Sequence, residues 1–88
     1  MELEEIRKEI DGIDREILRA LNRRFELALL AVKLKQHIED PVREAEVLRN
    51  VLAHSTGLLD PTFSGALYAL ILEESKELQM SDRLSRSG

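Results

Sequence analysis

Residues 3–35 read LEEIRKEIDGIDREILRALNRRFELALLAVKLK, and this stretch decides the fold. Apolar residues recur in it at alternating steps of three and four, the spacing of one helical face. The members of this face are Leu3, Ile6, Ile10, Ile13, Ile17, Ala20, Leu27, Ala31 and Leu34. Because no proline interrupts the pattern, it predicts one very long helix from Leu3 to about Ile38.

Such a helix is long for a chain of 88 residues. At roughly 1.5 Å per residue it spans about 50 Å, whereas a compact chain of this length has a radius of gyration of about 12 Å. The rest of the chain is too short to cover it, so we expect an intertwined homodimer. The alternative is a monomer in which the helix breaks near Gly12 or Asn22 and folds back on itself.

One position of the apolar face is charged. Arg24 stands where the spacing expects an apolar residue, and a buried guanidinium is costly unless an anion meets it. Two interpretations stay open at this point, a carboxylate of the partner chain and an anionic ligand.

Composition narrows the class of protein. The chain has the length of one domain, and 43% hydrophobic but only 3% aromatic residues suit an aliphatic helix bundle. The absence of cysteine excludes disulfides and thiolate chemistry, and a net charge of -4 argues against a general nucleic-acid binder. No run is apolar enough for a membrane span, and the acidic N-terminus is unlike a signal peptide, so we expect a cytoplasmic protein.

Two shorter helices are predicted after the long one. Asp40-Pro41 and Asp60-Pro61 both place an N-cap aspartate before a proline at the first helical position. The first of these helices runs to about Ser55, with Gly57 as its stop, and the second runs from Pro61 to about Met80. With no strand signal, the sequence predicts an all-α fold of three helices. We expect a domain over residues 1–80 and a frayed polar tail over residues 81–88.

Several polar residues lie on or beside apolar faces and predict a ligand pocket. They are Arg24, Lys35, Asp40, Arg43, Glu44, Ser75 and Gln79. Lys35 follows Arg24 by about three helical turns on the same face. Together these residues offer hydrogen-bond donors and fixed positive charge, which can bind an anion, hold a flexible molecule and stabilise charge in a transition state.

Nucleophilic and metal chemistry fit this sequence poorly. Neither His37 nor His54 has the spacing of a catalytic triad or a metal site, and no Glu-x-x-His pair is present. We therefore expect no cofactor and no metal.

Three segments resemble the all-helical chorismate mutases. They are the long-helix run quoted above, DPVREAEVL at 40–48 and ILEESKELQ at 71–79, so the resemblance covers roughly residues 3–80. It implies a homodimeric isomerase of aromatic amino-acid (Phe/Tyr) biosynthesis with two shared active sites. The implied reaction is the Claisen rearrangement of chorismate to prephenate, without a cofactor, a metal or a covalent intermediate. No dehydratase or dehydrogenase pattern accompanies it, and we expect a monofunctional enzyme.

The resemblance also implies a role for each site residue. Arg24 and the other protomer's Arg7 would bind the two carboxylates of chorismate, and Lys35 and Gln79 would donate hydrogen bonds to its ether oxygen. Glu44 would bind the ring hydroxyl. The remaining positions would contact a carboxylate or order their neighbours: Asp40, Arg43 and Ser75. Arg7 and Arg24 lie about 25 Å apart along one helix, so both reach one ligand only if the two chains run antiparallel.

The link after Lys35 departs from the family. Only residues 36–39 precede Asp40, a shorter link than family members usually have. A shorter link would leave the pocket more open and would shift Asp40, Arg43 and Glu44.

Two other functions stay open. An isochorismate-pyruvate lyase or an aminodeoxychorismate mutase would use the same scaffold, although Glu44 favours chorismate. A non-catalytic dimerisation or regulatory module would prefer an apolar residue or asparagine in place of Arg24.

Overall fold

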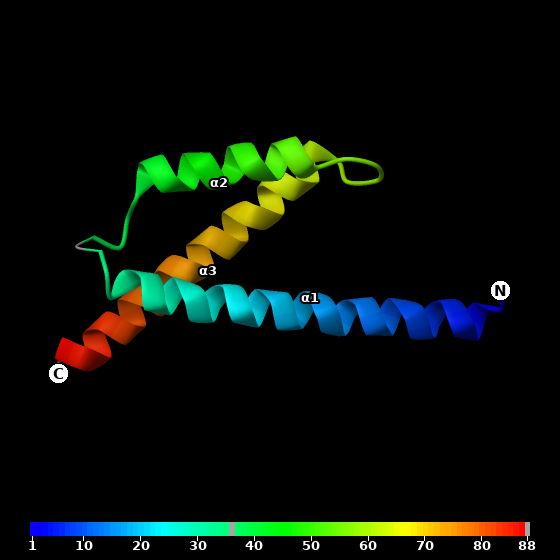
Figure 1. Cartoon of the computed structure of the whole chain (residues 1–88), viewed down its shortest axis with the longest axis horizontal. Helices are drawn as coiled ribbons and strands as arrows, with labels where there is room; N and C mark the ends of the chain where they lie inside the picture. The colour runs from blue at the N-terminus through cyan, green and yellow to red at the C-terminus, as the bar shows by residue number, and fades with distance from the viewer. Residues whose placement is uncertain (36, 88) are drawn as a thin grey trace.

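The computed structural model describes residues 1–35 and 37–87 as three helices, α1 (Leu3–Val32), α2 (Pro41–His54) and α3 (Pro61–Ser87). Residues 36 and 88 lie outside this description. α3 runs obliquely from the end of α2 to the C-terminal end of α1 and packs against both, while α1 and α2 do not pack against each other in the described part of the chain (Figure 1). The prediction of an all-α fold with a very long first helix is confirmed.

α1 is continuous but shorter than predicted. It passes through Gly12 and Asn22 without a break, so the fold-back alternative is wrong. It ends at Val32 rather than near Ile38, because its last bonds tighten to the three-residue spacing, from the Lys33 N–H to the Leu30 carbonyl (3.2 Å) and from the next N–H to the Ala31 carbonyl (3.0 Å). Lys35 therefore lies in the segment between α1 and α2, which is called the link from here on, and not on the helical face of α1.

The local start signals of the other helices act as predicted. An Asp40 carboxylate oxygen accepts a hydrogen bond from the Arg43 N–H at 3.1 Å, which caps α2. An Asp60 carboxylate oxygen accepts from the Thr62 N–H at 3.4 Å at the start of α3. Gly57, with a φ of 64°, does not cap α2 but turns the chain beyond its end, in a conformation that suits a residue without Cβ.

The predicted frayed tail is wrong for residues 81–87, which continue α3. An ion pair of 3.1 Å joins Asp82 to Arg86 one turn later, and Arg83 binds the end of α1. These contacts stabilise the added turns. Gly88 lies outside the described residues.

Little apolar surface is buried within one chain. Among the described residues, the buried apolar side chains are Val32, Val47 and Ile71. The N-terminal half of α1 extends past the other two helices, and its apolar face is exposed, with Ile10 at 51% and Ile13 at 54% (Figure 1). The radius of gyration is 16.2 Å, well above that of a compact chain. No described helix has both the length and the apolar character that a membrane span requires.

Candidate functional site

A cavity of about 330 Å³ lies where the C-terminal half of α1, the link, the start of α2 and the middle of α3 meet. Its volume is that of a small-molecule pocket. The residues lining it include every predicted site residue except Arg7: Arg24, Lys35, Asp40, Arg43, Glu44, Ser75 and Gln79. Predicted site residues from α1, the link, α2 and α3 therefore lie around one cavity.

Contacts between α1 and α3 form a regular polar ladder at one wall of the cavity. Its contacts join Arg24 to Ser75, Gln79 to Ala28 and Arg83 to Val32, and each pair is separated by 51 residues. Because the members on each helix are four residues apart, successive turns of the two helices meet in register. We call this set the α1–α3 ladder.

Arg24 keeps most of its donors for a ligand. Its Nη1 donates to the Ser75 hydroxyl at 3.2 Å, and its guanidinium carbon lies 5.8 Å from the centre of the Tyr68 ring, a cation–π distance. No carboxylate among the described residues forms an ion pair with it. Since a guanidinium carries five N–H groups, the half-buried Arg24 can still receive an anion.

Gln79 is held with its amide nitrogen toward α1. The side chain is only 5% exposed, and Nε2 donates to the Ala28 carbonyl at 2.8 Å. The amide oxygen of Gln79 cannot donate a hydrogen bond to a carbonyl, so this contact fixes the amide nitrogen as the end that faces Ala28. The amide nitrogen has a second N–H, which remains for a ligand in the cavity.

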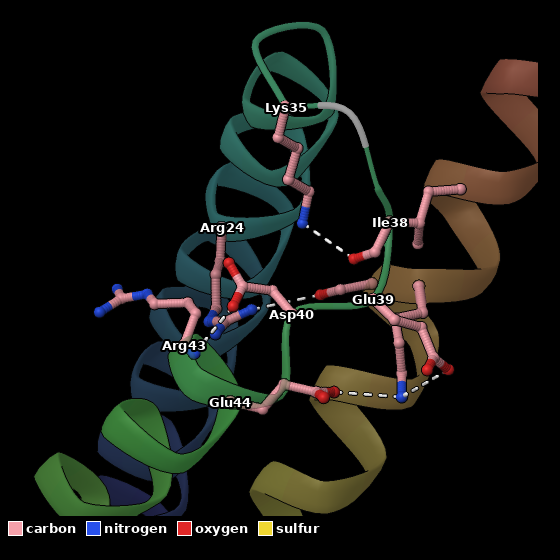
Figure 2. A network of polar contacts seen from close by, with 9 residues as sticks. Arg24, Lys35, Ile38, Glu39, Asp40, Arg43 and Glu44 are labelled. Atoms are coloured by element: carbon pink, nitrogen blue, oxygen red, sulfur yellow. Dashed lines mark hydrogen bonds and ion pairs between the residues drawn. The ribbon is translucent and has the colours of Figure 1, made fainter.

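Lys35 reaches the cavity from the link. Its ammonium donates to the Ile38 carbonyl at 2.9 Å, a contact visible in Figure 2. An ammonium has three N–H groups, so further donors remain. The loss of its predicted place on α1 therefore does not remove Lys35 from the site.

Glu44 has a partner on α3 that the sequence did not predict, Lys76. The ammonium of Lys76 lies 3.1 Å from a Glu44 carboxylate oxygen and 3.8 Å from Glu39. The hydrogen bond and the negative charge of Glu44 raise the pKa of Lys76, against a small opposing effect of burial. A raised lysine pKa means that the pair stabilises the fold fully below the ordinary lysine pKa and that this contribution is lost as the pH rises through the raised value. Lys76 is therefore protonated at neutral pH.

Asp40 and Arg43 lie at the edge of this arrangement. Asp40 uses a carboxylate oxygen to cap α2, and Figure 2 shows the guanidinium of Arg43 projecting away from Arg24 and Lys35. The Arg43 side chain is exposed. Within one chain these residues shape the rim of the cavity rather than its interior.

Arg7 is not brought to the cavity of its own chain. It lies near the free N-terminal end of α1, exposed, in an ion pair of 3.0 Å with Glu4. The rise of α1 separates it from Arg24 by about 25 Å.

Metal-binding clusters are not found in the described residues, where no group of three or more His, Cys, Asp or Glu side chains could hold an ion. The Nδ1 atom of His54 lies 2.7 Å from the Asn50 carbonyl in its own helix. The cavity thus presents cationic and amide donors from α1, the link and α3, together with the carboxylates of Asp40 and Glu44.

The sequence model of the chorismate mutase type II family matches residues 6–80. Among curated proteins, the bifunctional chorismate mutase/prephenate dehydratase of Aquifex aeolicus (strain VF5) is 47% identical over 55 residues. This alignment covers 58% of the chain and 15% of that relative, so the chain corresponds to a small part of the bifunctional protein. The search of solved structures found no match.

Proposed function

Because the chain belongs to the chorismate mutase type II family, we propose that its cavity converts chorismate to prephenate by an intramolecular Claisen rearrangement. The observation that carries this proposal is Arg24, a half-buried guanidinium in the cavity with no carboxylate partner among the described residues. Chorismate has two carboxylates and would supply the missing anion. The cytoplasmic location and the place in aromatic amino-acid biosynthesis remain predictions from the sequence.

The reaction requires the protein to hold the substrate in a reactive conformation and to stabilise the charge that develops on it. One carbon–oxygen bond of the ether breaks while one carbon–carbon bond forms, and no proton or electron is exchanged with the protein. Negative charge grows on the ether oxygen, so donors already aimed at it favour the transition state over the ground state. Arg24 binds a carboxylate and holds the substrate in its reactive shape.

Lys35 and Gln79 are the proposed donors to the ether oxygen. Each is tied to a backbone carbonyl, of Ile38 and Ala28 respectively, and each retains at least one further N–H. Side chains anchored in this way lose little freedom when the transition state forms, which is the condition for effective charge stabilisation.

Glu44 is the proposed acceptor for the ring hydroxyl, with Lys76 holding its carboxylate from α3 at 3.1 Å. A hydroxyl donor fits this position, which favours chorismate. An isochorismate-pyruvate lyase or an aminodeoxychorismate mutase would use the same cationic wall, and the identity of the product separates these reactions.

A second copy of the chain completes the proposed site. The exposed apolar face of α1 needs a cover, and a second α1 running antiparallel would supply one. If Arg7 of one copy reaches Arg24 of the other, the two-fold axis crosses α1 between Arg15 and Glu16. Arg7 would then bind the second carboxylate of chorismate, and each dimer would hold two equivalent sites.

The direct test is turnover by the purified chain. Chorismate absorbance should fall without added metal or cofactor, and the product should be prephenate. Formation of pyruvate would instead identify a lyase, and a folded dimer that consumes no chorismate would contradict the proposal.

Gln79→Glu is expected to make the rate steeply dependent on pH. A carboxyl donates to the ether oxygen only when protonated, and with a carboxyl pKa near 4.3 to 5.5 only about one molecule in 10² to 10³ is protonated at pH 7.5. The rate kcat/KM of the variant should therefore be at least about 10²-fold below wild type at pH 7.5 and should recover as the pH falls toward 5. Wild type should show no such acid rise. Parallel pH profiles of the two proteins would remove Gln79 from its proposed role.

A further inference from the structure

Arg83 lies outside the part of the chain that matches the family, which ends at residue 80. It nevertheless forms the last step of the α1–α3 ladder. Its Nη2 donates to the Val32 carbonyl at 3.1 Å and to the Lys35 carbonyl at 3.2 Å. The first of these carbonyls ends α1, and the second belongs to a residue of the proposed site.

This contact supplies a hydrogen-bond donor to backbone carbonyls at and just after the end of α1. The last carbonyls of a helix have no partner within the helix and carry its partial negative charge, which a cation stabilises. Val32 is buried, so its own carbonyl has limited access to water. A guanidinium spans two carbonyls at once, which an ammonium does less well.

The contact matters for the proposed site because Arg83 and Gln79 lie on the same face of α3. Gln79 lies one turn earlier on the same face of α3, with its amide on the Ala28 carbonyl of α1. The same stripe of α3 therefore places Gln79 directly and fixes the backbone of Lys35 through Arg83. The side chain of Lys35 is held from its other end by the Ile38 carbonyl.

We propose that Arg83 is a positioning residue of the site, which fixes the Lys35 backbone relative to α3 so that the two proposed ether-oxygen donors keep their separation. This proposal rests on the proposed function for its kinetic meaning. Arg83, which lies beyond the family match, thus holds the chain at the Lys35 carbonyl, just after the end of α1.

The kinetic test compares Arg83→Ala with Arg83→Lys and with the control Arg86→Ala. Arg86 lies within one turn of Arg83, and its ion pair is with Asp82 of the same helix. Displacing Lys35 should lower kcat about 10- to 100-fold in Arg83→Ala, with KM changed less than about twofold, because carboxylate binding is left intact. Arg83→Lys should recover part of the loss, and Arg86→Ala should match wild type. Circular dichroism well below the melting temperature confirms that the variants compared are folded.

The double variant Lys35→Ala/Arg83→Ala separates positioning from general destabilisation. If Arg83 acts through Lys35, its removal has no further effect on kcat once the Lys35 side chain is gone. An equal loss in both backgrounds, or an unchanged kcat in Arg83→Ala, would overturn the proposal.

Amide hydrogen exchange gives a readout that does not depend on turnover. The peptide containing Lys35 should exchange faster in Arg83→Ala than in wild type, while peptides from the N-terminal half of α1 should be unchanged. Unchanged exchange of the Lys35 peptide rejects the positioning role even if the wild-type protein is active. Faster exchange in a protein that does not consume chorismate supports the anchoring and rejects the proposed function alone.

Discussion

Arg24→Ala should lower kcat/KM for chorismate about 10³-fold or more, the largest effect expected from any single substitution in the chain. The guanidinium provides charge-assisted hydrogen bonds to a carboxylate in a partly enclosed cavity, and alanine replaces none of them. Among the described residues, its polar and cation–π contacts are the Ser75 hydroxyl and the Tyr68 ring, so the helices should remain folded. Initial rates of chorismate loss measure the effect, and circular dichroism checks the fold.

Arg23→Ala is the matched control for this experiment. Arg23 is the preceding residue, its side chain is 63% exposed, and it pairs with Glu26 at 3.1 Å on the surface of α1. Because exposed ion pairs of this kind contribute little to stability, the activity of Arg23→Ala should stay within about twofold of wild type. If Arg24→Ala kept a tenth of wild-type activity, Arg24 would not be the main carboxylate-binding residue.

Arg24→Leu distinguishes an enzyme from a dimerisation module. In a module, an apolar residue at this position should stabilise the helical interface and preserve its only function. In the proposed enzyme, the same change abolishes turnover whatever it does to stability. Turnover and melting temperature should therefore be measured on the same preparation.

The second large effect that we expect is the return of activity when two inactive variants are mixed. Arg7→Ala and Arg24→Ala each damage both sites of a homodimer, since the proposed site takes Arg24 from one copy and Arg7 from the other. A heterodimer of the two variants has one site with both changes and one site with neither. Random pairing makes about half of the dimers heterodimers with one of two sites intact, so about a quarter of wild-type activity should return.

The mixing experiment needs exchange of subunits and a neutral neighbour as control. Equal amounts of the two variants are unfolded and refolded together, with mass spectrometry of differently tagged chains to count heterodimers. Lys8→Ala, next to Arg7, should be fully active without mixing. Heterodimers that form in the expected proportion but remain inactive would show that Arg7 and Arg24 do not serve one shared site.

Local sequence signals were sufficient for much of the fold. The apolar spacing of α1 and the Asp-Pro starts of α2 and α3 depend on residues close in the chain, and the structure confirms them. The candidate site could be predicted because a polar residue on an apolar face is detectable one helix at a time. Arg24, Ser75 and Gln79 are of this kind, and all of them line the cavity.

Features that depend on contacts between distant segments were predicted wrongly or missed. The end of α1 at Val32 and the added turns of α3 are linked through Arg83, across a separation of 51 residues. Arg83 lies one turn after Gln79 on the face of α3 that also carries Ser75, and this spacing indicates a contact with α1. The polar residues around Arg83 instead favoured the prediction of a tail. Lys76 was missed because its partner Glu44 lies on another helix.

The α1–α3 ladder divides the cavity into a constant part and an adjustable part. Its contacts join α1 and α3 directly and in register, so the relation of Arg24 to Gln79 does not depend on how many residues lie between the two helices. Glu44 is carried by α2, which packs on α3 but not on α1 and is joined to α1 through the link. A change in link length should therefore move Glu44, and Lys35 through its contact with the Ile38 carbonyl, while Arg24 and Gln79 keep their separation across the ladder.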